Sequence, residues 1–242
     1  MIFIFICAMF MIYVILFFSR VSVFFLSRAK VHECIETNHE FYVRFSDADF
    51  SARRVKTIEE YLAKIKPSMS CFSLSEKLKI LYCIYLADYR IRQIHFDWYD
   101  GEKACRIPWK IGCVKGKTYE DGMPHTIRDT IILSRDIVNS YTTDELVKTL
   151  IHENVHLYQK RYPEDTRRYL SEHNFSVYKK RDPEDLVRSN PDIDDYIYQD
   201  KTTIYKAEYK TPNPSFIEDT KKQDEYTEHP FEQMALKIEN MK

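Results

Sequence analysis

A short motif in the second half of the chain has the spacing of a metal-binding helix. It reads His152-Glu153-Asn154-Val155-His156, which is the pattern H-E-x-x-H. Residues i and i+4 of a helix lie one above the other, about 6 Å apart, so two imidazoles can reach one Zn²⁺. Glu153 is rotated by about 100° from His152 and would lie beside the metal, where a general base for an attacking water belongs. The motif predicts a hydrolytic zinc site with His152 and His156 as ligands and Glu153 as the catalytic base.

The residues around the motif predict the helix that this spacing requires. Thr142 and Glu145 have the spacing of a capping box, and Pro163 ends the pattern. Apolar residues recur between them at helical intervals, namely Leu146, Val147, Leu150, Ile151, Val155 and Leu157. We therefore expect a helix over residues 143–160 whose apolar surroundings bury the histidines. The simpler interpretation is a surface helix that carries two titrating histidines.

A catalytic zinc site has three protein ligands and an open fourth position, so a third ligand must come from elsewhere. The best candidate is Glu232, because Pro230 suits the first position of a helix and Glu232 then lies in its first turn. Ala235, one turn later, would allow close packing of this helix on another. Glu228 and His229 are the alternative ligands, and a first-turn glutamate that favours the helix dipole would also explain Glu232.

With these residues the chain resembles the gluzincin branch of zinc metallopeptidases. It is similar in particular to metallopeptidases of large double-stranded DNA viruses over about residues 95–240. The resemblance rests on five stretches: Gly122-Met123-Pro124-His125-Thr126, Ile131-Ile132-Leu133-Ser134, Thr149–Gln159, Asn190-Pro191-Asp192 and Glu228–Ala235. It implies a zincin-like core in which a short sheet precedes the active helix and the edge strand holds an extended peptide substrate by main-chain pairing.

Other polar residues near the motif are candidates for supporting roles. His125 is either an oxyanion donor or a turn-capping histidine. Tyr158 and Gln159 follow the motif and could support its ligands, and Asp192 or Asp194 could orient a zinc-bound histidine through its outer N–H.

Tyrosines of a predicted hairpin are either further donors to the substrate or packing residues. The four are Tyr196, Tyr198, Tyr205 and Tyr209. His95, between apolar neighbours, is expected at the edge of the core rather than in a site.

The remaining elements predict an α+β domain over residues 67–242. Residues 130–134 are expected to form a buried strand, and residues 196–205 a hairpin. Ser73 and Glu76 form a second capping box, and the helix that follows is expected to bury one broad face. That face comprises Leu74, Leu78, Leu81, Tyr82, Tyr85, Leu86 and Tyr89. Loops and short strands are expected over residues 101–122, which hold all four glycines. Residues 27–66 are expected to be a spacer with one accessory helix over residues 51–66.

The first 19 residues carry no charge, and apolar character continues to Leu26. A segment of this length is long enough to span a bilayer, so we expect a single-pass anchor over residues 1–26, with a cleaved signal peptide as the alternative. Arg20, Arg28 and Lys30 follow the charge-free run and predict that the body faces the cytoplasm, where the Asn174 sequon stays unmodified.

The whole composition excludes some classes of protein. Lys and Arg number 36 against 37 Asp and Glu, a balance that argues against nucleic-acid binding. The six cysteines contain no CxxC pair, and we interpret them as reduced thiols.

The sequence thus predicts a membrane-anchored zinc metallopeptidase that cleaves peptides or proteins. The alternative is an inert structural or interaction protein that retains a zinc site, although such a site has no need of Glu153.

Overall fold

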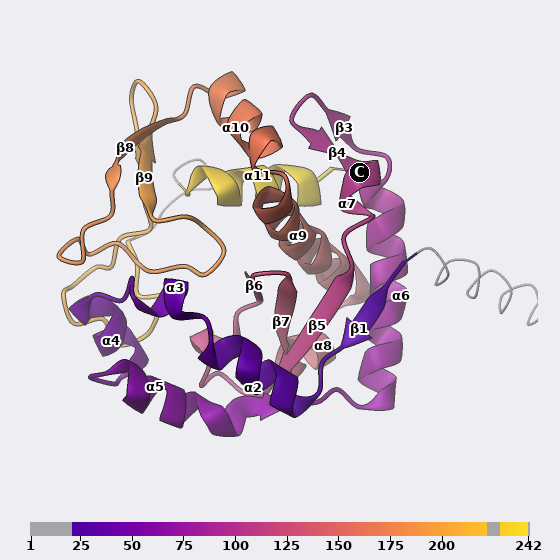
Figure 1. The fold of residues 1–242 in the computed structure, drawn as a ribbon, viewed down its shortest axis with the longest axis horizontal. Coiled ribbons are helices and arrows are strands. Elements are labelled where there is room, and N and C mark those ends of the chain that lie inside the picture. Colours follow the sequence, from indigo (N-terminus) through magenta and orange to yellow (C-terminus); the bar gives the residue numbers. More distant parts are fainter. Residues whose placement is uncertain (1–20, 222–227, 242) are drawn as a thin grey trace, which may run out of the picture.

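A mixed five-stranded sheet forms the framework of the protein, whose computed structural model describes residues 21–221 and 228–241 (Figure 1). The strands are β1 (Val23–Phe25), β2 (Met69–Ser70), β5 (Trp109–Val114), β6 (His125–Ile127) and β7 (Thr130–Ser134). Their order is β1-β5-β7-β6, and β2 also pairs with β5. β1 and β7 run parallel to β5, whereas β6 is antiparallel to β7. This arrangement confirms the α+β class and the strand predicted over residues 130–134.

Helices and two small sheets complete the fold. The helices are α2 (Arg28–Glu36), α3 (His39–Tyr42), α4 (Asp47–Arg53), α5 (Ile58–Ile65), α6 (Leu74–Ile91), α7 (Gly101–Ala104), α8 (Arg135–Ser140), α9 (Thr143–Arg161), α10 (Pro163–Glu172) and α11 (Pro230–Glu239), with the 3₁₀ turns η1 (Lys66–Ser68) and η2 (Glu120–Gly122). One small sheet pairs β3 (His95–Phe96) with β4 (Tyr99–Asp100), and the other joins β8 (Ser176–Lys180), β9 (Tyr196–Gln199) and β10 (Ile204–Tyr205). The pairing of β9 with β10 confirms the predicted hairpin.

The sheet is buried on both faces, because successive side chains of a strand point to opposite sides. In β7, Ile131 and Leu133 pack with α6, α9 and α11, whereas Ile132 packs with α2 and α5 on the other side. Gly112 of β5 lies opposite Ile132, where an added Cβ would come within 2.6 Å of the isoleucine Cδ1. The sheet therefore separates an N-terminal helical layer from the layer that carries the HExxH helix.

The HExxH helix forms as predicted. Thr142 and Glu145 make the reciprocal capping box of α9, in which the Thr142 side chain accepts from the Glu145 N–H and the Glu145 carboxylate accepts from the Thr142 N–H. α11 begins at Pro230 in its first position, as predicted, and packs against α9. Figure 1 shows α11 crossing one end of α9, above the sheet.

The outward face of α6 was predicted wrongly. Its capping box forms, but Leu74, Leu78, Tyr82 and Tyr89 are exposed. The buried face is the neighbouring one, formed by Glu76, Ile80, Cys83, Ile84, Ala87, Asp88 and Ile91. The two faces are both largely apolar, so periodicity could not decide which one meets the core.

The single helix expected over residues 51–66 is also a wrong prediction. Residue Arg54 adopts a left-handed conformation with φ of 55° and separates α4 from α5. Tyr61 and Ile65 of α5 pack on the sheet side, whereas Ala48 and Ala52 of α4 pack with Tyr209 and Ile217. We expected loops and short strands over residues 101–122. This range contains β5, which is the longest strand of the five-stranded sheet.

The predicted membrane anchor mostly precedes the described part of the chain. Residues 1–20 lie outside the described residues, so that the anchor itself stays a prediction. Residues Val23–Phe25, which we assigned to its end, form strand β1 in the sheet. Within residues 21–221 and 228–241, no helix is both long and apolar enough to cross a membrane.

A buried charge network joins the N-terminal helices to the loop before β6. The guanidinium of Arg53 donates to both oxygens of Glu120, at 2.9 and 2.6 Å, and also contacts Asp49. Asp49 in turn accepts from Arg181 at 2.6 Å and from the Ser189 main-chain N–H at 3.0 Å. The network therefore fixes the segment around residue 189, which leads into the candidate site.

We predict that Glu120→Ala destabilises the protein strongly. The substitution leaves the buried Arg53 guanidinium without its bidentate partner, and such a loss costs about 3 to 5 kcal/mol of unfolding free energy. Glu164→Ala is the matched control, because Glu164 pairs with Arg167 at the exposed surface and should contribute less than about 1 kcal/mol. Urea unfolding followed by the fluorescence of the buried Trp98 and Trp109 measures both variants. Equal losses would contradict the structural role of the network.

Candidate metal centre

The three predicted ligands meet at one point between α9 and α11. His152, His156 and Glu232 form the one group of His, Cys, Asp or Glu side chains, among the described residues, that is arranged to hold a metal ion. The Nε2 atoms of the two histidines lie 3.1 Å apart. Oε2 of Glu232 lies 3.1 Å from the first of these nitrogens and 3.4 Å from the second. The structure thus brings together all three residues that the sequence proposed.

These separations fit a tetrahedral ion. Ligand atoms held at about 2.0 to 2.1 Å from a tetrahedral Zn²⁺ lie about 3.3 Å from one another. The three observed separations lie close to this value. Two nitrogens and one carboxylate oxygen are also a donor set that zinc prefers, and they leave one tetrahedral position free.

The outer nitrogens of both imidazoles are fixed by acceptors. Nδ1 of His152 lies 2.9 Å from Oε2 of Glu239, and Nδ1 of His156 lies 2.9 Å from Oε1 of Gln159. An acceptor at Nδ1 requires the N–H there, and it leaves the Nε2 lone pair to face the centre of the site. Two such lone pairs 3.1 Å apart repel each other unless a cation or a proton lies between them.

Gln159 and Glu239 thus occupy the supporting positions around the histidines. The support by Gln159 was anticipated in the sequence, and its amide is itself held by donation to the Phe231 carbonyl at 2.9 Å. Glu239 was missed, because it follows Glu232 by seven residues and no local pattern links it to His152. Two turns of helix place both glutamates on the side of α11 that meets α9.

The contacts among the ligands shift the pKa values of His152 and Glu232 in opposite directions. Burial disfavours the imidazolium of His152, but hydrogen bonds with Glu232 and Glu239 outweigh burial and hold its pKa well above the usual range. Burial also disfavours the carboxylate of Glu232, but the facing imidazoles outweigh it and keep the pKa well below normal. A metal ion must displace the proton of His152, so its affinity falls as the pH falls.

Glu153 lies beside the three ligands and not among them, as the helical rotation predicts. Its side chain is buried, and Oε2 has no hydrogen-bond partner among the described residues. Burial, reinforced by the nearby Asp192 carboxylate, raises the pKa of Glu153 well above normal, although His152 opposes the shift. A cation held by the ligands would favour the ionised form that a general base requires.

A cavity of about 250 Å³ opens on these side chains. Its lining includes His152, Glu153, Glu232, Asn190, Asp192 and Leu236. Asn190 donates to Oε1 of Glu232 at 2.7 Å, which leaves Oε2 to face the histidines. Ala235 of α11 is completely buried and allows α11 to approach α9 closely.

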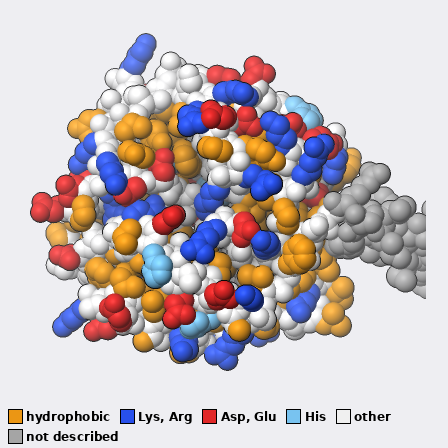
Figure 2. All heavy atoms as spheres, viewed as in Figure 1, with side chains coloured by type: hydrophobic (Ala, Val, Ile, Leu, Met, Phe, Trp, Pro, Cys, Tyr) orange, Lys and Arg blue, Asp and Glu red, His pale blue; other side chains and the backbone are white. Residues whose placement is uncertain are grey.

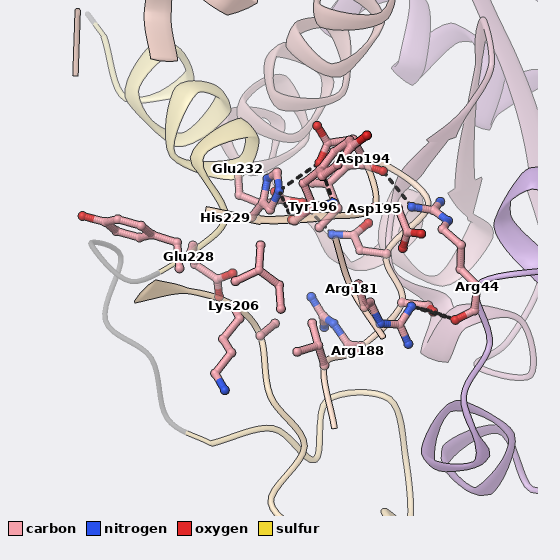
Figure 3. Close-up of a pocket in the computed structure, with 17 residues that line it drawn as sticks. Arg44, Arg181, Arg188, Asp194, Asp195, Tyr196, Lys206, Glu228, His229 and Glu232 are labelled. Carbon is pink, nitrogen blue, oxygen red and sulfur yellow. Dashed lines mark hydrogen bonds and ion pairs between the residues drawn. The ribbon is translucent and has the colours of Figure 1, made fainter. Parts of the chain in front are cut away.

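The alternative ligands lie outside the metal group. The ring of His229 caps α11, since its Nδ1 accepts from the Phe231 N–H at 3.2 Å and its Nε2 lies 3.2 Å from the Tyr196 carbonyl oxygen. Figure 3 shows His229 turned toward Asp194 and Tyr196. Glu228 lines the same cavity as Glu232. Neither residue belongs to the candidate metal group.

The candidate oxyanion donors are bonded within the protein. His125 donates from Nδ1 to the Met123 carbonyl at 3.1 Å, and its Nε2 lies 3.0 Å from the hydroxyl of Tyr119. Because burial lowers its pKa, the ring is neutral and has no free N–H. Of the two interpretations of His125, the structure therefore supports the turn-capping histidine and not the oxyanion donor.

Three of the four tyrosines of the hairpin region donate to carboxylates, and Tyr196 is 43% exposed. The pairs are Tyr198 with Asp194, Tyr205 with Asp200 and Tyr209 with Asp49. Tyr158 likewise donates to Asp165, so it does not support the histidines. His95 is exposed and lies outside the site.

The free edge of β6 is occupied by side chains. The N–H of Thr126 donates to Oδ1 of Asp192 at 2.6 Å, and its carbonyl accepts from Nζ of Lys160 at 3.0 Å. Asp192 therefore stabilises the strand edge, and neither Asp192 nor Asp194 orients a histidine of the site.

No protein-family model, curated protein or solved structure matches this chain at a significant level. The site must therefore be understood from its own geometry.

We predict that Glu232 and Glu228 differ sharply in zinc binding. The protein should bind about one zinc per chain, and His152→Ala should abolish binding. Glu232→Ala should weaken binding by more than the roughly 10- to 100-fold that is typical of residues outside the ligand set. Glu228→Ala, four residues away, should change it by less than about 10-fold. Competition with a chromogenic chelator measures all variants, and a larger loss in Glu228→Ala would show that the ligand is misassigned.

We also predict that Glu239 positions His152. Glu239→Ala should weaken zinc binding about 10- to 100-fold, because the imidazole loses the acceptor that fixes its orientation. Glu239→Gln keeps an oxygen that can accept from Nδ1–H and should restore part of the affinity. The exposed Glu172 provides the control variant Glu172→Ala. Identical affinities for the Ala and Gln variants would argue against a hydrogen-bonding role.

Proposed function

We propose that this protein is a zinc metallopeptidase of the gluzincin type, anchored to a membrane by its N-terminal segment with the body in the cytoplasm. One observation carries the proposal. Two Nε2 atoms and one carboxylate oxygen converge at tetrahedral spacing, beside a buried glutamate that lines a cavity and has one oxygen without a hydrogen-bond partner among the described residues. A structural zinc site has no use for this glutamate, because it fills the fourth position with protein.

The roles of the side chains follow from their positions. His152, His156 and Glu232 would hold the ion, while Glu239, Gln159 and Asn190 fix their orientations. Zinc bound there supplies a Lewis acid that polarises a carbonyl and lowers the pKa of water. Glu153 accepts the proton of the attacking water and then delivers it to the leaving amine.

The surroundings of the cavity favour an extended substrate such as a peptide. A second hollow, of about 970 Å³, shares Pro191 with the cavity and is lined in part by Arg128, Lys160 and Arg161. The two hollows are neighbours along the edge of β6. A chain that follows this edge would have to replace the bonds that Asp192 and Lys160 make to Thr126.

This occupied edge also supports a second candidate function. If the bonds to Thr126 persist, the protein binds zinc without turnover and acts as a membrane-tethered structural or interaction protein. The intact Glu153 favours the peptidase.

We predict that Glu153→Gln separates the two functions. The amide cannot accept a proton, so turnover should fall by about 10² to 10⁴-fold, the usual contribution of a general base. Zinc content should stay unchanged, because Glu153 is not a ligand. Cleavage of a peptide library by wild type and variant, with a zinc chelator and Glu164→Gln as controls, measures the effect.

Two outcomes would count against the peptidase. Equal cleavage by wild type and Glu153→Gln would indicate a different base or a contaminating protease. Full zinc binding without cleavage of any library or candidate membrane protein would favour the inert zinc protein.

A further inference from the structure

The outward face of α6 carries large apolar side chains that no described part of the chain covers. Leu74, Leu78, Tyr82 and Tyr89 are 75%, 58%, 53% and 63% exposed. Their spacing places them in one stripe, about 22 Å long at 1.5 Å per residue. Exposed apolar surface of this extent marks an interaction site in a folded protein.

The stripe continues onto the first described strand. Phe24 of β1 is 52% exposed. A surface hollow of about 480 Å³ is lined by residues 21–25 together with Leu81 of α6. β1 and α6 thus form one apolar surface, and Figure 2 shows hydrophobic side chains gathered along this edge of the molecule.

The acidic residues of α6 itself do not face the stripe. Both acidic residues of α6 point inward, since Glu76 accepts from Arg135 and Asn139, and Asp88 accepts from Trp109. Lys77 borders the stripe and lies 5.6 Å from the ring of Phe25, whereas Nζ of Lys79 donates to the carbonyls of Val138 and Tyr141. Farther along α6, Arg90 pairs with the exposed Asp144 of α9. An apolar face that carries tyrosines and has a lysine at its border suits the interface of an anionic bilayer.

The path of the chain also favours a bilayer as the partner of this face. The described structure begins at Val21, beside α6 (Figure 1). The 19 residues before Arg20 are uncharged and long enough to enter a bilayer. A chain that leaves the membrane at this point brings β1 and α6 to the membrane surface before any other element.

We propose that the outward face of α6, together with Phe24, lies on the surface of a lipid bilayer. This inference rests on the membrane anchor of the proposed function but not on its zinc chemistry. It assigns the body a fixed orientation, with β8 on the side away from the lipid (Figure 1).

Site-directed fluorescence in vesicles tests this orientation. The full chain, with Cys7, Cys34 and Cys71 replaced by serine, receives either Leu78→Cys or Val177→Cys and an environment-sensitive label. Val177 is the matched control, because it is a comparably exposed apolar residue of β8. The protein is reconstituted into vesicles of phosphatidylcholine and phosphatidylserine and recovered by flotation. Quenching is then measured with nitroxide lipids and with aqueous iodide.

The label at residue 78 should be quenched by nitroxide lipids and protected severalfold from iodide, and the label at residue 177 should behave in the opposite way. Tyr82→Cys repeats the measurement if the thermal unfolding of Leu78→Cys shows misfolding. Equal iodide quenching at both sites in floating vesicles would overturn the orientation and leave the anchor intact. Protection at residue 78 from both quenchers would assign the face to protein contacts and would also overturn it. Failure to float would overturn the orientation and the anchor together, whereas the zinc titrations would be unaffected.

Discussion

The distance between α9 and α11 is the constraint on which the candidate site depends. Two of the three ligands and Gln159 belong to α9, while Glu232 and Glu239 belong to α11, so that the metal group exists only where these two helices meet. Ala235 makes the contact close, and Met234 and Ile238 are buried beside it. Side chains at a helix contact set the separation of the axes, and a larger residue at position 235 would move Glu232 away from both histidines. The sheet and α6 hold α9 from the other side, and the fold thereby supports a site that no single element could build.

The polar groups of the site form a shell that restricts each ligand to one geometry. Each imidazole has one nitrogen committed to an acceptor, and each oxygen of Glu232 has its own partner. The network of Asp49, Arg53 and Glu120 extends this order, because Ser189 binds Asp49 and directly precedes Asn190. The N-terminal helices therefore contribute to the position of a metal ligand that lies far from them in the sequence.

Sequence patterns predicted the parts of this structure that local interactions determine. The capping box of Thr142, the proline at the start of α11 and the hairpin of β9 and β10 all formed as expected. The exposed face of α6 could not be predicted, because apolar residues recur at helical spacing on both faces, leucines and tyrosines on one and isoleucines, cysteine and alanine on the other. No glycine marks the break between α4 and α5 at Arg54. The role of Glu239 depends on its contact with His152, which lies 87 positions earlier. The features that could not be predicted are those that depend on the packing of segments distant in the sequence.

The side chains at the edge of β6 have a consequence for the solubility of the protein. An exposed strand edge is a template for pairing with other chains, and folded proteins often protect such edges with charged groups, lysine in particular. Lys160 and Asp192 occupy both main-chain groups of Thr126 and so remove a place where a second molecule could add a strand. The protection is made of side chains rather than of another strand, and it is therefore reversible. The same edge can resist indiscriminate aggregation and still be available to a segment that offers better hydrogen bonds.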